Sequence, residues 1–450
     1  MRDLAFIAFL AALFGIGFRR PFVLVLVYVY IDIVAPQRLT YLLLNNIQIS
    51  LVAVIAAVGA WAIADDKTHM RTAPRQILMV ILLLYCGLTT TQADFPLQAA
   101  DKWSWVWKAL AFAIFLPWTL RTRLRIEALA LFMVIAAGSI IVVGGIKTLG
   151  SGGGYGVLNL MVTNNTGLYE SSIISAVAIT IIPLILFLMK HGTVFPPDWR
   201  VKAYGAALIF AALLIPVGTQ ARTGLICIAV LGVLLLRSTK RRFLYLGLVG
   251  AAALTITPYL PASFTARMGT IQSYKADQSA STRLAVWAWT WDYVQKNPMG
   301  GGFDAFRGNK LRIETQKTQS AGGQVDKSEH VDIDKARAYH SSYFEMLGEQ
   351  GFFGLFVWLL IHFGGIVRME IVYRTYRKRA IDDDQWIGAL ANALQQGHII
   401  YLAGALFVGI AFQPFVYMLV GLQIGLDTYA SRRAREAAWR PITAQSLAPA

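Results

Sequence analysis

The chain has 450 residues, of which 56% are hydrophobic and 15% are charged, and its formal net charge at pH 7 is +16. A soluble domain this apolar would expose large hydrophobic surfaces, so the composition excludes an ordinary soluble enzyme and indicates an integral membrane protein. The two cysteines lie far apart in apolar segments, which excludes a disulfide framework and a cysteine zinc site.

Continuous apolar segments recur along the chain at about the 17–25 residues that a helix needs to cross a bilayer. We therefore predict an all-α polytopic membrane protein with about twelve transmembrane helices. Hydropathy and the placement of basic residues together predict N-terminal membrane helices at 1–260, a loop domain at 261–342 on the non-cytoplasmic (periplasmic) side, C-terminal membrane helices at 343–431 and a cytoplasmic tail at 432–450. The expected spans are 3–18, 21–38, 41–64, 77–93, 104–120, 128–149, 171–190, 202–220, 223–238, 243–260, 352–368, 397–413 and 415–430.

The excess of lysine and arginine falls in short clusters between alternate spans. This distribution follows the positive-inside rule and argues against a nucleic-acid-binding surface. We expect the clusters to be cytoplasmic. The connections between them, including the long polar loop domain at 261–342 (the insert), should then be periplasmic. The clusters are Lys67 with Arg71 and Arg75, Arg121 with Arg123 and Arg125, Arg237 with Lys240–Arg242, Arg374 with Arg377–Arg379, and Arg432 with Arg433 and Arg435.

Arg222 stands alone between two apolar runs, with almost no loop around it. A charged side chain near membrane depth is costly and usually faces a cavity or a partner, so Arg222 is a candidate binding residue. The alternative is an interfacial arginine that extends to lipid headgroups. In the predicted topology Arg222 opens to the same side as the insert.

Within the insert, Ser281-Thr282-Arg283 precedes a tryptophan-rich segment that Asn297-Pro298 ends. Because Arg283 and Trp287 lie four residues apart, they share one face of an amphipathic helix along the membrane surface. Arg283 could bind lipid headgroups, or it could bind a substrate phosphate through a bidentate guanidinium contact.

His340 follows Tyr339 at the end of the insert, directly before an apolar helix. An imidazole at this boundary could act as a general base near neutral pH, although a histidine in a loop can also be incidental. Asp332 and Asp334 could chelate a divalent cation. In the charge-rich run from Asp326 to Arg337 they fit better in a solvated loop.

These residues carry a resemblance to the O-antigen ligase and polymerase superfamily. The matching pattern comprises Ser281-x-Arg283-x3-Trp287, Asn297-Pro298-x-Gly300-x-Gly302, His340-Ser341-Ser342-Tyr343 and Gly348-Glu349-x-Gly351-x2-Gly354. An isolated arginine after an apolar run, here Arg222, resembles another feature of that superfamily. Arg19-Arg20-Pro21 and the overall length resemble its branch of O-antigen-ligase-like proteins, which includes O-glycosylation ligases.

The resemblance implies a metal-independent glycosyltransferase of the GT-C type, without a cofactor, in the bacterial inner membrane. It would transfer a glycan from undecaprenyl diphosphate to lipid A–core oligosaccharide at the periplasmic face, with inversion. Arg222 and Arg283 would bind the diphosphate, His340 would be the general base, and Trp287 and Tyr339 would contact substrate. Membrane lipids are the other expected partners. An O-antigen polymerase and a protein O-glycosylation ligase remain alternatives, and a lipid-linked-sugar transporter is a more distant one.

Overall fold

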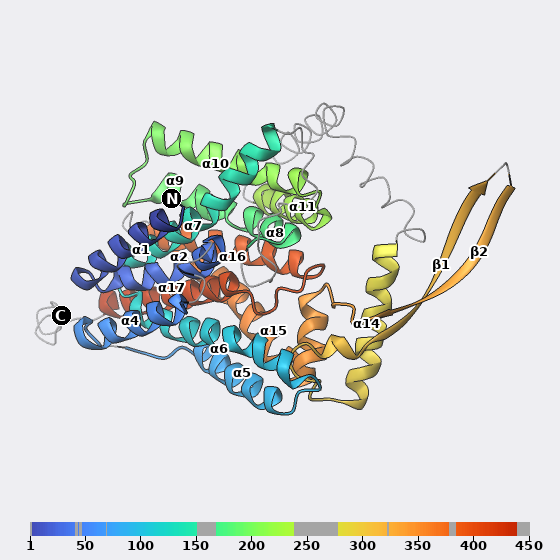
Figure 1. The fold of residues 1–450 in the computed structure, drawn as a ribbon. Helices are drawn as coiled ribbons and strands as arrows, with labels where there is room; N and C mark the ends of the chain where they lie inside the picture. The colour runs from blue at the N-terminus through green and yellow to red at the C-terminus, as the bar shows by residue number, and fades with distance from the viewer. Residues whose placement is uncertain are drawn as a thin grey trace, which may run out of the picture.

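A computed structural model describes residues 2–40, 44, 47–68, 70–150, 168–237, 278–321, 324–377 and 384–438. The glycine-rich segment near Gly152, the expected span at 243–260 and the basic residues 240–242 lie outside this described part of the chain. The described residues form a helical bundle with one β-hairpin that projects from it (Figure 1).

The first half of the bundle contains helices that mostly coincide with the predicted spans. The helices are α1 (Arg2–Arg19), α2 (Phe22–Val34), α3 (Pro36–Leu39), α4 (Ile49–Ala64), α5 (Pro74–Thr91), α6 (Pro96–Thr119), α7 (Arg123–Gly150), α8 (Ser171–Thr180), α9 (Ile182–His191), α10 (Trp199–Gly218) and α11 (Arg222–Arg237). Proline at the first position starts α3, α5 and α6, where its missing N–H costs no hydrogen bond.

The second half contains α14 (Gln278–Lys296), the short 3₁₀ helix η2 (Ala305–Gly308), strands β1 (Lys310–Ala321) and β2 (Gln324–Lys335), α15 (Ser342–Tyr376), α16 (Gln385–Ala405) and α17 (Pro414–Ala438). α15 packs against α5, α16 and α17, and α6 packs against α17. The helices of the insert and of the bundle therefore meet at α15.

The described residues include five helical segments that are long and apolar enough to cross a membrane, which confirms an α-helical membrane protein. They are α5, α7, the α8–α9 pair, α10 and α15, and α2 and α4 are shorter apolar helices. The count of about twelve spans and the periplasmic position of the insert stay predictions.

Two local predictions were wrong. The expected span at 397–413 is instead α16, which ends at Ala405, and residues 406–413 are not helical. The segment from Asp326 to Arg337 is not a loop, because residues up to Lys335 form β2 in an antiparallel ladder with β1. Its apolar residues Val331 and Ile333 alternate with charged ones, which is typical of a strand. The large number of charged residues in this run led to the loop prediction.

The basic loops around α5–α7 and the end of α17 gather at one end of the bundle. Arg125 pairs with Asp65 at 2.6 Å, and Arg121 pairs with Asp66 at 3.1 Å. Arg432 donates to the backbone carbonyl of Arg121. These contacts bring together loops that the positive-inside pattern had assigned to one side.

Arg75 does not belong to that loop surface, because its side chain is buried inside the bundle. Its Nη1 donates to Oε1 of Gln423 at 2.9 Å, and Gln423 Nε2 lies 3.0 Å from His398 Nδ1. His398 Nε2 in turn lies 2.7 Å from His362 Nδ1. This chain of polar groups gives Arg75 Nη1, Gln423 and His398 hydrogen-bond partners, which offsets part of the cost of burying them.

A break inside α15 positions the insert against the bundle. Gly351 has φ 63° and ψ −166°, a conformation that is essentially restricted to glycine. Gly301 donates its N–H to Gly348 O at 3.0 Å, and Phe352 donates to Pro298 O at 3.1 Å. These hydrogen bonds join the turn after α14 to the middle of α15, where the helix is broken at Gly351.

Replacing Gly351 with alanine is expected to destabilise the fold by roughly 2–4 kcal/mol, through backbone strain and a clash. The added Cβ would lie 2.0 Å from Pro298 O and 2.5 Å from the carbonyl carbon of Met299. Gly364→Ala, in the same helix and with nothing within 4 Å of the added Cβ, is the matched control and should be neutral or slightly stabilising. Unfolding measured in detergent micelles tests both variants, and equal stability of the two would contradict this account.

Candidate functional site

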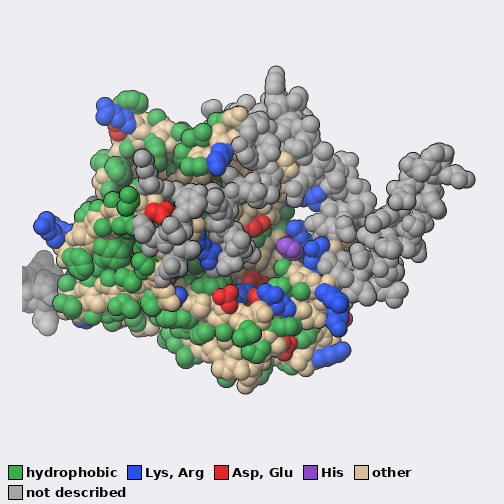
Figure 2. Space-filling view, viewed as in Figure 1, with side chains coloured by type: hydrophobic (Ala, Val, Ile, Leu, Met, Phe, Trp, Pro, Cys, Tyr) green, Lys and Arg blue, Asp and Glu red, His purple; other side chains and the backbone are tan. Residues whose placement is uncertain are grey.

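A cavity of about 770 Å³ opens at the end of the bundle where α14 and the hairpin lie. Figure 2 shows Lys, Arg, Asp and Glu side chains gathered near the centre of the viewed face. Its walls come from the end of α2, the first half of α6, the start of α8, α14, η2, the turn before α15 and the segment 407–413. The charged and imidazole side chains that line it are Asp32, Arg38, Asp101, Lys102, Lys108, Glu170, Arg283, Asp304, Arg307, His340, Glu345 and Glu349.

His340 is held in a turn that other parts of the insert fix. Asn309, at the base of the hairpin, donates its side-chain amide to Arg337 O at 2.7 Å and accepts from Arg337 N at 2.9 Å. Trp287 Nε1 donates to Tyr339 O at 2.9 Å, and the Trp287 ring stacks on Phe344. His340 itself has φ 49°, a conformation uncommon outside glycine, so the surrounding bonds hold a strained backbone.

Arg283 on α14 lines the same cavity as His340, so the structure brings these two predicted residues together. Partial burial lowers the pKa of His340 below its usual value of 6.5, and the charges of Arg283 and Arg337 lower the pKa further. The carboxylate of Glu170 acts in the opposite direction. At neutral pH the imidazole is therefore mostly uncharged, which a general base requires.

Trp287 and Tyr339, both predicted to contact substrate, help to hold the turn that carries His340. Tyr339 is 2% exposed, and its ring packs edge-on against Phe306. A Cβ added to Gly348 would lie 2.4 Å from the Tyr339 hydroxyl oxygen, so the phenol fits directly over that glycine. Tyr339 is among the residues around the cavity, whereas Trp287 is not.

Arg222 is the first residue of α11 and does not line the cavity. The preceding turn, with Gln220 at φ 53°, packs against α8 through a 2.8 Å contact between the hydroxyls of Thr219 and Ser175. The first residues of α8, from Ser171 to Ile173, do line the cavity. Arg222 is therefore one helix removed from the site that contains His340.

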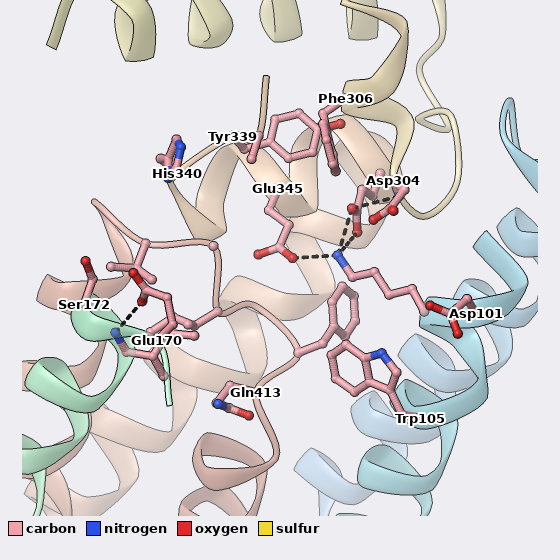
Figure 3. Close-up of a pocket in the computed structure, with 18 of the residues that line it drawn as sticks. Asp101, Trp105, Glu170, Ser172, Asp304, Phe306, Tyr339, His340, Glu345 and Gln413 are labelled. Atoms are coloured by element: carbon pink, nitrogen blue, oxygen red, sulfur yellow. Dashed lines mark hydrogen bonds and ion pairs between the residues drawn. The ribbon is translucent and has the colours of Figure 1, made fainter. Parts of the chain in front are cut away.

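A buried ion cluster forms the cavity floor, and the sequence analysis missed it. Lys102 Nζ lies 2.7 Å from Glu345 Oε1, and 2.8 and 2.9 Å from the two carboxylate oxygens of Glu349 (Figure 3). Glu349 also accepts from Asp304 N at 3.0 Å, and Glu345 accepts from Ala411 N at 3.0 Å. The cluster thereby ties α6, the η2 turn, α15 and the 407–413 segment together.

A signal for this cluster was present in the sequence. Glu345 and Glu349 lie four residues apart in the mostly apolar start of a membrane helix, and Lys102 directly precedes the tryptophan-rich run at 103–107. Carboxylates at that depth require a cationic partner, which predicts a buried pair but not which lysine supplies the charge.

The cavity contains carboxylates, cations and a neutral imidazole, a set that can bind an anionic group and abstract a proton from a hydroxyl. Glu170 caps α8 by accepting from Ile173 N at 2.7 Å and faces the cavity near Ser172 (Figure 3). Among the described residues, no group of three or more His, Cys, Asp or Glu side chains is placed to hold a metal ion.

Comparison with known families gives two matches that cover different parts of the chain. Residues 206–359 match the family described as O-antigen ligase, and residues 1–193 match a family of unknown function (DUF5935). A comparison with curated proteins gave no match. The first match includes α14, the hairpin, His340 and the break in α15. The match over residues 206–359 confirms the resemblance to the O-antigen ligase superfamily seen in the sequence.

Proposed function

We propose that this member of the O-antigen ligase superfamily transfers a preassembled glycan from undecaprenyl diphosphate to a sugar hydroxyl of lipid A–core oligosaccharide. The reaction would take place at the periplasmic face of the bacterial inner membrane. Family membership supports a ligase or polymerase function in O-antigen or glycan assembly. The choice of donor, acceptor and membrane face is the proposal.

In the proposed step the acceptor oxygen attacks the anomeric carbon of the donor sugar from the face opposite the diphosphate. His340 accepts the proton of the acceptor hydroxyl as the new C–O bond forms. The bond between the anomeric carbon and the diphosphate oxygen breaks, undecaprenyl diphosphate leaves, and the anomeric centre is inverted. Arg283 and Arg222 would stabilise the negative charge that develops on the leaving group.

The observation that carries this proposal is the position of His340 and Arg283 on one cavity, with an imidazole whose pKa is lowered. The base acts on the acceptor hydroxyl and the cation on the leaving diphosphate, on opposite sides of one anomeric carbon, so the two must share a site. Arg222, which lies beside α8 and not on the cavity, would have to act on a part of the diphosphate nearer that helix.

The identity of the product tests the function. Purified full-length protein in liposomes would be supplied with lipid-linked glycan and lipid A–core, and the products would be separated by mass. A glycan–lipid A–core conjugate is the expected product. A longer lipid-linked polymer, a glycosylated protein, or movement of the donor across the bilayer without a new glycosidic bond would each overturn the ligase assignment.

The pH dependence of kcat/KM should report the protonation of His340, because only the neutral imidazole can accept a proton. Activity is retained above the pKa of His340 and lost as the pH falls through it. Arg337→Gln removes a cation that lowers this pKa, so the acid limb should move to higher pH. Glu170→Gln removes a carboxylate that raises it, so the acid limb should move to lower pH.

The two substitutions are controls for each other, since they change the charge near His340 in opposite senses. Gln at position 170 can still accept the hydrogen bond from Ile173 N and cap α8. Acid limbs that stay in place, or that move in the same direction in both variants, would show that another group titrates.

A further inference from the structure

A second cavity, an apolar groove of about 430 Å³, lies between α7, α9 and α10. Its walls include Val134 and Ile135 from α7, Ile185 and Leu188 from α9, and Leu208 from α10. It shares no lining residue with the cavity that contains His340. These walls can accept a hydrocarbon chain but offer little to a polar ligand.

The mouth of this groove has the features of a membrane interface. Arg200, in the first turn of the candidate membrane helix α10, lines the groove and is exposed. Beside it, Trp199 is 69% exposed and Tyr204 is 59% exposed, and amphipathic rings of this kind concentrate at the level of lipid headgroups. A ligand with a hydrocarbon chain in the groove would therefore carry its polar end at Arg200.

The polar groups near the mouth favour an anionic ligand. Glu127 also lines the groove, but its carboxylate is already occupied by Thr193 and by the backbone N–H of Val194, at 2.7 Å. It is also 1% exposed, so it does not offer its charge at the surface. The groove also lies at the end of the bundle that carries the basic loops (Figures 1 and 2).

We propose that this groove binds one anionic glycerophospholipid, with an acyl chain between α7, α9 and α10 and the phosphate at Arg200. Guanidinium groups pair well with phosphate oxygens, and the apolar walls replace the bilayer around the chain. The site is independent of the proposed transferase reaction, because it lies on different helices at the opposite end of the bundle from His340.

Native mass spectrometry of the purified full chain, after transfer from bilayers of phosphatidylglycerol and phosphatidylcholine, measures this binding directly. The wild type should retain one phosphatidylglycerol in preference to phosphatidylcholine. Arg200→Glu should weaken retention at least about tenfold, given the loss and reversal of one interfacial charge. Ile135→Trp, which fills the groove from its 39% exposed position, should weaken retention without changing any charge.

Lys202→Glu is the matched control, since it makes the same charge change two residues away at a side chain that does not line the groove. Its retention of phosphatidylglycerol should stay close to that of the wild type. Equal retention in Arg200→Glu and wild type, equal binding of the two phospholipids, or displacement by an uncharged polyprenol would overturn the proposal. If Arg200→Glu fails to fold, the Ile135→Trp comparison gives the same decision.

Discussion

Replacing His340 with asparagine is expected to lower the rate of glycan transfer by roughly 10²–10⁴-fold, the usual contribution of a positioned general base. Asparagine is the informative replacement because residue 340 has φ 49°, which asparagine tolerates better than alanine. It also cannot accept a proton at neutral pH. The loss of activity can then be attributed to the missing imidazole and not to a collapsed turn.

His340 is exposed at the cavity, so its replacement removes no core packing. The thermal unfolding of His340→Asn should therefore match that of the wild type. His191→Asn, half-buried at the other end of the bundle, is the control and should leave the rate unchanged. A His340→Asn protein that transfers glycan as fast as the wild type would show that the base lies elsewhere.

Replacing Lys102 with methionine is expected to have the largest effect on stability, about 3–5 kcal/mol, because it leaves two buried carboxylates without their cation. The side chain of Glu349 is 0% exposed and that of Glu345 is 9% exposed, so water solvates these carboxylates poorly once the ammonium group is gone. The uncompensated carboxylates also repel each other across one helical turn. We expect the η2 turn and the 407–413 segment to separate from α15.

A double-mutant cycle tests this assignment. The variant that combines Lys102→Met with Glu349→Gln removes one negative charge as well, so it should be more stable than Lys102→Met alone. Lys102→Arg keeps the charge and should lose less stability than Lys102→Met. If the double variant were as unstable as the sum of its single variants, the ion cluster would not be the source of the effect.

The sequence predicted those parts of the structure that depend on local patterns. Apolar segments of membrane length located α5, α7, α10 and α15, since a helix in lipid must bury its polar backbone whatever surrounds it. His340 and Arg283 were found because each stands in a short motif of the insert. Both line the same cavity.

The features that were missed depend on partners distant in sequence. Lys102 and Glu349 are separated by 247 positions, so no local pattern links them. The end of α16 at Ala405 is equally non-local, because Ser342 Oγ donates to Val408 O at 2.8 Å and accepts from Ile410 N at 2.9 Å. These bonds pair backbone groups of the 406–413 segment with the Ser342 side chain. The segment therefore does not need helical hydrogen bonds at those positions, despite its apolar composition.

The walls of the His340 cavity extend from Ile31 to Gln413, and this separation has a consequence for biosynthesis. A nascent chain inserts its helices from the N-terminus onwards, so α2 and α6 enter the bilayer long before α15 exists. Lys102 then has no carboxylate partner until Glu345 and Glu349 have been translated. The cavity can therefore be complete only once α15 and the 407–413 segment have been added, near the end of synthesis.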